Sequence, residues 1–161
     1  MLRTLLADRF KLRVRRESRQ NAVYDLVLAR RDRRLGARLM PSPRPCGGPP
    51  PERPCGYRRI SLGGEIRLES SSIAALASSL GPFVQRIIVD RTGLTGNYDL
   101  TLEWNPELTD LPGPDAPAGG VWSGKPGLFT ALQEQLGLKL QAVQGAVDVL
   151  VIDDATRPTP D

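Results

Sequence analysis

The chain has 161 residues, of which 40% are hydrophobic and 25% charged, and its net charge is +4. This composition is typical of a globular domain that is large enough to bury a hydrophobic core. The absence of histidine excludes a Ser–His or Cys–His nucleophile pair and any histidine-containing zinc site, and two cysteines are too few for a four-cysteine zinc site. No apolar run approaches the roughly 18 residues of a membrane helix, so we expect no membrane insertion.

Positive charge is concentrated near the start of the sequence. Residues 1–34 contain eleven basic and four acidic residues, which gives +7, whereas the remainder carries −3. A basic end of this kind suits nucleic acid, an acidic partner or an anionic lipid surface. The simpler interpretation is a solvated strand face that is rich in arginine.

The first predicted elements are a helix and two strands. Leucines at the start of the chain predict a short helix over residues 2–9. Alternating apolar and basic residues predict a strand over 10–14, with Phe10 directed into the core. After a polar turn at 17–21, a second strand is expected over 23–29. Residues 30–64, with seven prolines, six glycines and both cysteines, predict a long insert.

The middle of the chain predicts a strand, a helix and a strand pair. The strand covers 65–69, and the serines at 70–72 are candidate N-caps for a helix that begins at Ile73. Gly81-Pro82 should end this helix. We expect 87–90 and 98–104 to pair with each other through a tight connection in which Gly93 and Gly96 adopt positive φ.

The last third predicts a helix followed by a hairpin. After a second insert at 105–124, Pro126 is placed to begin a helix that Gly137 closes. Residues 138–143 and 147–152 are expected to pair across Gln144-Gly145, and 154–161 form a tail.

These elements repeat as helix–strand–strand units. The units lie in residues 1–29 and 65–153, and we expect them to form a single domain over 1–161. Each unit has one apolar helix face and a ribbon too small to be stable alone. The sequence therefore predicts an α+β fold of repeated helix–β-hairpin units, with helices packed on an antiparallel or mixed sheet.

Eight residues separate Cys46 from Cys55 within the first insert. In an oxidising compartment they would form a disulfide, which is the favoured interpretation because paired cysteines in such a loop suit a secreted protein. The alternatives are two free thiols in a cytosolic loop, or half of a metal site completed by another chain.

No residue set predicts catalysis. Asp90 and Thr92 resemble part of an aspartic-protease loop, but an arginine intervenes and no second loop exists, so we expect them to hydrogen-bond their own turn. The carboxylates show no paired spacing, and the serine run has no base nearby. Trp104 and Trp122, near the ends of the second insert, are expected to be buried rather than to stack on a ligand. We predict no enzyme activity, cofactor or metal.

Lys11, Arg13 and Arg15 form the candidate interaction surface, because they would project from one face of the first strand. A nucleic-acid-binding module using these residues is the alternative function, which the lack of interleaved aromatic residues makes less favoured.

Four stretches carry a family resemblance: LLADRFKL at 5–12, VDRTGLTGNYDLTLEW at 89–104, LFTALQEQLGLKL at 128–140 and VLVID at 149–153. In this order they resemble the acidobacterial duplicated-orphan family, a Solibacter-type domain of unknown function. The order of helices and strands is also similar to the short N-terminal domain of secretins and TonB-dependent receptors, a periplasmic protein-interaction module.

The resemblance implies an exported protein, in some members attached to a membrane-bound metallopeptidase sensor, and it supplies no catalytic residue. Members generally have a further segment before LLADRFKL, so this chain is either a shortened one or one that is not exported. The expected function is a non-catalytic, extracytoplasmic protein-interaction or sensory domain. We expect it to bind another envelope protein through a sheet edge or the arginine-rich strand.

Overall fold

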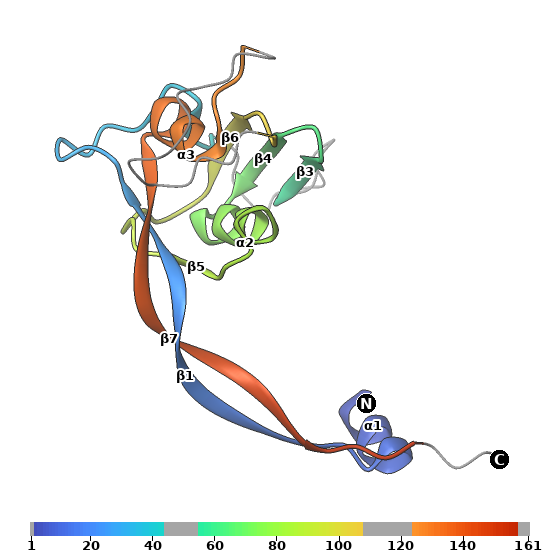
Figure 1. Ribbon diagram of the computed structural model, residues 1–161. Helices are drawn as coiled ribbons and strands as arrows, with labels where there is room; N and C mark the ends of the chain where they lie inside the picture. The colour runs from blue at the N-terminus through green and yellow to red at the C-terminus, as the bar shows by residue number, and fades with distance from the viewer. Residues whose placement is uncertain (1, 44–54, 108–123, 158–161) are drawn as a thin grey trace. The chain divides into compact units, whose positions relative to one another are not determined.

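The computed structural model describes residues 2–43, 55–107 and 124–157. Its helices and strands confirm the predicted α+β class, and its sheets include both parallel and antiparallel pairs (Figure 1). The chain divides into two compact units: unit 1 comprises Met1–Ala22 and Gln144–Asp161, and unit 2 comprises Val23–Val143.

Unit 1 contains the helix α1 (Leu2–Phe10) and the outer parts of two long strands, β1 (Arg13–Leu28) and β7 (Leu138–Asp154). The predicted first helix is confirmed. The segment just after β7 lies beside the end of the helix, because the Thr156 N–H donates to the Phe10 carbonyl at 2.7 Å. Phe10 is the last residue of α1 and is 37% exposed, so the prediction that it begins a strand and faces the core is wrong.

Both hairpins expected from the sequence are replaced by single strands. The predicted turn at 17–21 lies within β1, and Gln144-Gly145 lies within β7. β1 and β7 are neighbours in one sheet. Backbone bonding between segments more than a hundred residues apart therefore determines their conformation here, against the local turn signal.

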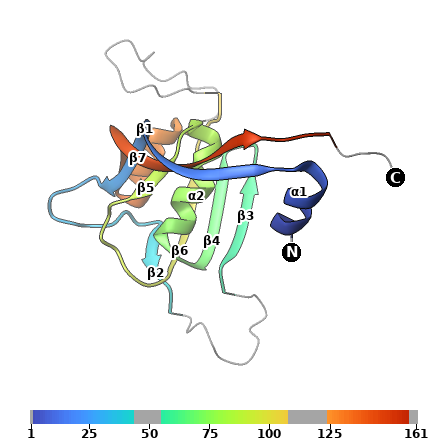
Figure 2. The ribbon, with the colours of Figure 1, turned by 90° about the horizontal axis from the view of Figure 1, so that it is seen from below.

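Unit 2 contains a four-stranded antiparallel sheet in the order β2-β6-β4-β3 (Figure 2). Its strands are β2 (Leu39–Pro41), β3 (Tyr57–Ser61), β4 (Glu65–Ser71) and β6 (Tyr98–Glu103). The predicted strands at 65–69 and 98–104 are confirmed, and the first predicted insert contains the edge strands β2 and β3. Alternate residues of β6 are buried, so one face of the sheet faces the core.

The short strand β5 (Ile88–Asp90) belongs to the other sheet, whose order is β5-β1-β7. It pairs in parallel with β1, with Tyr24 opposite Ile88 and Leu26 opposite Asp90. The expected pairing of 87–90 with 98–104 is therefore wrong. The connection does contain two glycines at positive φ, 68° at Gly93 and 87° at Gly96, as predicted.

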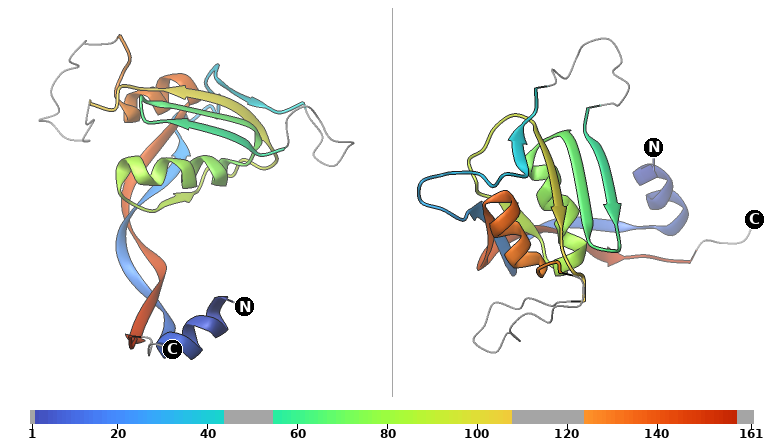
Figure 3. Two further views of the ribbon diagram at one scale, coloured as in Figure 1. Left: turned by 90° about the vertical axis from the view of Figure 1, so that its right-hand side faces the viewer. Right: turned by 90° about the horizontal axis from the view of Figure 1, so that it is seen from above.

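The helix α2 (Ile73–Val84) covers one face of the four-stranded sheet (left view of Figure 3). The predicted N-cap is confirmed at Ser72, whose hydroxyl accepts from the Ala75 N–H at 3.2 Å. The predicted stop at Gly81-Pro82 is wrong, since the helix continues to a left-handed C-cap at Gln85. Phe83 in this last turn packs edge-on against Trp104, with ring centroids 4.9 Å apart, a contact that favours continuation.

The predicted helix before Gly137 is present in two parts, an α-helical turn, α3 (Leu128–Ala131), and a π-helical turn, η1 (Leu132–Leu136). Gly137 closes it with φ 70°, as predicted. The core of unit 2 joins this helix to α2 and the sheets; its largest fully buried side chains include Trp104, Leu26, Ile66, Leu76, Leu102, Leu132 and Leu136.

Candidate functional site

The outer part of β1, Arg13–Ala22, and the outer part of β7, Gln144–Asp154, form a two-stranded segment that we call the outer ribbon. Arg13 and Arg15 lie on it two positions apart and are exposed, so they share a face as predicted. Lys11 does not lie on the ribbon. It occupies the connection after α1 with φ 51°, so its predicted place on the same strand face is wrong.

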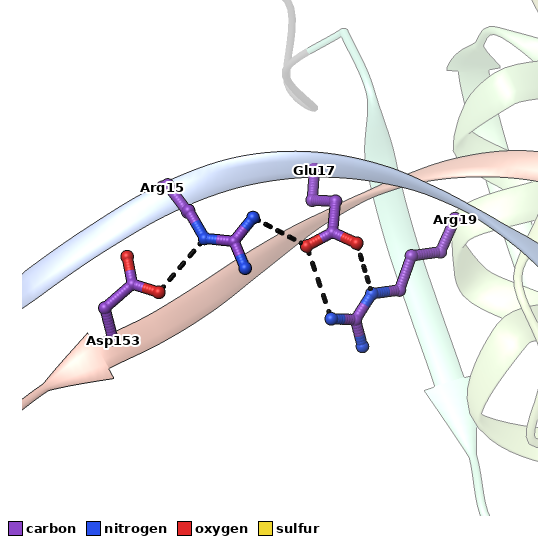
Figure 4. A network of polar contacts seen from close by, with 4 residues as sticks. All are labelled: Arg15, Glu17, Arg19 and Asp153. Carbon is purple, nitrogen blue, oxygen red and sulfur yellow. Dashed lines mark hydrogen bonds and ion pairs between the residues drawn. The ribbon is translucent and has the colours of Figure 1, made fainter.

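One face of the outer ribbon carries a network of ion pairs (Figure 4). Arg15 donates to Asp153 at 3.0 Å and to Glu17 at 2.9 Å, and Arg19 donates to Glu17 at 3.0 Å. Arg19 donates twice to the same carboxylate, the second bond at 3.3 Å. The network therefore neutralises much of the positive charge that the sequence places here.

The electrostatics of this network follow from these bonds. The hydrogen bond from Arg19 lowers the pKa of Glu17 below its usual value. The hydrogen bond to Asp153 raises the pKa of Arg15. Both shifts favour the charged forms of Glu17 and Arg15. No sequence pattern pointed to Asp153 as the partner of Arg15, because 138 positions separate the two residues.

The opposite face of the outer ribbon is exposed along its whole length. Along β7 the side chains alternate between more and less covered positions, and the even-numbered residues are the exposed ones. They include two large apolar side chains, Leu150 at 61% and Ile152 at 64% exposure. Val14 on β1 is 39% exposed. The odd-numbered Arg15 and Asp153 bond to each other across the two strands, so the even-numbered residues of both strands share the other face. We call this surface the even face, formed by the even-numbered residues 14–20 and 146–154.

The outer ribbon also presents backbone. On the edge of β1 that faces away from β7, the strand β5 pairs with Tyr24–Leu26 only. In the part of the chain that the structure describes, no strand continues β5 along Arg13–Ala22, and β7 is the last strand of its sheet. Unpaired N–H and C=O groups along such edges can accept a further strand.

In unit 2, the serine run marks an irregular end of β4 as well as the start of α2. The β4–β6 register shifts between Leu68 and Ser71. Ser70 adopts φ 46°, and its N–H donates to the Asp99 carboxylate at 2.7 Å. A shallow depression of about 540 Å³ adjoins these serines and Arg58. The prediction that the run begins a helix is confirmed, and the bulge before it was not predicted.

Two of the carboxylates that could be considered for acid–base chemistry, Asp90 and Glu103, have structural partners. Asp90 accepts bonds from the N–H and the hydroxyl of Thr92, at 3.0 and 2.8 Å, which confirms that these residues stabilise their own turn. Glu103 accepts from Arg38 at 2.6 Å and lies 3.6 Å from the Lys125 ammonium. The bond from Arg38 is the main cause of its lowered pKa.

Trp104 is buried, as predicted, whereas Trp122 lies outside the described residues. The candidate disulfide involves Cys46, which also lies outside them. Cys55 lies in the turn before β3 and is exposed. Pairing of the two cysteines therefore stays a prediction.

Among residues 2–43, 55–107 and 124–157, no group of three or more acidic or cysteine side chains is arranged to hold a metal ion. Within the same ranges no helix has both the length and the apolar character needed to cross a membrane.

Comparison with known proteins gives one match. A model of a protein family of unknown function, DUF3738, matches residues 1–155. Neither a curated protein nor a solved structure matches the chain. The expectation of a domain of unknown function is confirmed, while the acidobacterial, secretin and TonB likenesses remain predictions. The matched region covers nearly all of the sequence, and the chain belongs to the DUF3738 family.

Proposed function

We propose that this chain is a non-catalytic protein-interaction or sensory domain of the cell envelope, and that it binds another envelope protein through the outer ribbon. The observation that carries the proposal is the open backbone edge of β1 over Arg13–Ala22, together with the edge position of β7. Strand addition at such an edge supplies backbone hydrogen bonds, while the neighbouring side chains select the partner.

The charge pattern of the ribbon favours protein over nucleic acid. Arg15 and Arg19 already donate to Asp153 and Glu17. A phosphate backbone would have to compete with these carboxylates for the same guanidinium groups. An acidic or mixed-charge protein strand can instead join the existing network of alternating charges.

An extracytoplasmic location is part of the proposal. It is supported by the resemblance to exported acidobacterial proteins and to the periplasmic secretin and TonB module, and by the spacing of Cys46 and Cys55 in the first insert. An oxidising compartment would keep these two cysteines joined. Mass spectrometry of protein isolated from its host without reductant should then show a mass two hydrogens lower than after reduction. Two freely alkylated thiols in the isolated protein would contradict this location.

The function is tested by site-specific cross-linking in the native host. A photoreactive residue at Asn21, which is exposed on β1, should capture one envelope protein reproducibly. The same residue at Leu62, which is 87% exposed in unit 2, provides the control and should not capture it. Capture from Leu62 alone, or of nucleic acid from Asn21, would contradict the proposal.

Strand addition has a further signature. Once the captured partner is purified, hydrogen exchange of the complex should slow at backbone amides of Arg13–Ala22 or Gln144–Asp154. Unchanged exchange in both segments would show that the partner does not use the ribbon edges.

A further inference from the structure

We propose that the even face of the outer ribbon is a contact surface between two copies of this chain. The face is distinct from the backbone edges, because its side chains project perpendicular to the ribbon. Leu150 and Ile152 lie on this face and are more than half exposed, and Val14 lies on it as well. A two-stranded ribbon gains little stability from its own contacts, so an apolar face of this kind favours a covering partner.

The charges on the even face identify the partner as a second copy. On β1 the face carries one cation, Arg16, and on β7 it carries two anions, Asp148 and Asp154. All three are exposed, and no ion pair within the described part of the chain involves them. The Arg15–Glu17–Asp153 network lies on the opposite face and leaves these charges available.

A two-fold arrangement pairs these features. When two ribbons stack face to face about an axis along the strands, β1 of one copy lies over β7 of the other. Hydrogen bonds beyond both ends of this strand pair, from Ala29 to Gly137 and from Thr156 to Phe10, fit a register in which Val14 lies opposite Ile152 within one copy. In the stacked pair, Val14 therefore meets Ile152 of the partner subunit. Arg16 comes within reach of Asp148 of the partner subunit, and the symmetry repeats both contacts. A face with a cation on β1 and anions on β7, beside an apolar end, is therefore complementary to itself.

The experiment is sedimentation velocity of the purified full chain over about a hundredfold range of concentration, where mass action should convert monomer into dimer. Leu150→Lys should weaken association about tenfold or more, because it places a charge in the apolar contact. Leu62→Lys makes the same chemical change at an exposed position of unit 2 and should leave association unchanged. Near-ultraviolet circular dichroism from buried Trp104 verifies that each variant is folded.

A charge exchange tests the specific pairing. Arg16→Asp and Asp148→Arg should each weaken the dimer, because each places two like charges opposite one another. The double variant should restore it, since the pairs re-form with opposite polarity. The proposal is overturned by a chain that stays monomeric at every concentration. It is equally overturned by a dimer that Leu150→Lys does not weaken, or that the charge exchange does not restore.

Discussion

At the scale of single residues, backbone packs closely against backbone where the segment before β2 crosses the end of η1. The Gly36 N–H donates to the Leu136 carbonyl at 2.9 Å. A Cβ atom added to Gly36 would lie 2.2 Å from the backbone oxygen of Gln135, and one added to Gly137 would lie 2.7 Å from the Gly36 nitrogen. The two glycines therefore permit backbone contact that no other residue allows.

This contact predicts that Gly36→Ala destabilises the protein by about 2 kcal/mol or more, because backbone atoms must move to admit the methyl group. Urea unfolding followed by Trp104 fluorescence measures the change. Gly63→Ala is the matched control, since the nearest atom to its added Cβ would be the Ser61 hydroxyl oxygen at 3.5 Å. Equal stabilities of the two variants would show that the crossing segment adapts freely.

A second residue-scale prediction concerns acid stability. Glu103 has a lowered pKa in the folded protein, chiefly because Arg38 donates to it. A group whose pKa is lower in the folded state stabilises that state above its unfolded pKa, and this contribution disappears as the pH falls through the folded pKa. As the pH falls through the folded pKa of Glu103, the free energy of unfolding of the Glu103→Gln variant should therefore decrease less than that of the parent protein.

Urea unfolding at a series of pH values from neutral to about pH 2 measures this difference. Arg38→Gln should shift the carboxyl titration of Glu103, followed by NMR, back toward its ordinary pKa. A titration midpoint that is the same with and without Arg38 would contradict the assigned cause.

At the scale of elements, the π-helical turn η1 is attached to β6 by one side chain. The Gln135 amide accepts from the Glu103 N–H at 3.0 Å and donates to the Glu103 carbonyl at 2.7 Å. It thus occupies the position that a neighbouring strand would take beside the end of β6. We expect Gln135→Ala to destabilise the protein by about 1–3 kcal/mol, because two partly buried backbone groups lose their partner.

Gln133→Ala removes the same side chain from an exposed position in the same turn, and chemical denaturation of both variants makes the comparison. A similar loss in both would indicate that helix propensity, rather than the bonds to Glu103, causes the effect.

The sequence predicted those elements whose ends are determined locally. Ser72 caps α2 through its own hydroxyl, and Gly137 closes η1 through its own φ, so both boundaries could be inferred from neighbouring residues. The lengths of β1 and β7 and the place of β5 could not, because distant segments determine them. The contact of Phe83 with Trp104 likewise favours continuation of α2 beyond Gly81-Pro82, where the sequence predicted its end.

The candidate site divides in the same way. Period-two alternation correctly placed Arg13 and Arg15 on one exposed strand face. It misplaced Lys11, because α1 continues to Phe10 and a left-handed residue is needed to leave the helix. The even face went unrecognised, since the alternation that directed Phe10 into a core puts Val14 on the same side, and the exposure of Leu150 depends on what covers β7.

At the scale of the whole molecule, the described core lies entirely within unit 2. The cluster of buried side chains runs from Leu26 to Leu138 along the sequence. Unit 1 contributes the isolated buried residue Val147 among its described hydrophobic residues. Since burial of apolar surface is the main source of folding free energy, unit 2 should hold most of the stability.

A shortened chain of residues 23–143 should therefore still unfold cooperatively and retain the near-ultraviolet circular dichroism of Trp104. In the full chain, native-state hydrogen exchange should be faster in the outer ribbon than in β4 and β6, because the ribbon has little buried apolar surface to oppose local opening. Raising the protein concentration should slow exchange in the ribbon if the even face associates, and leave β4 and β6 unchanged. A shortened chain without cooperative unfolding would instead mean that the ribbon is required for the core to form, and that the two units share one folding transition.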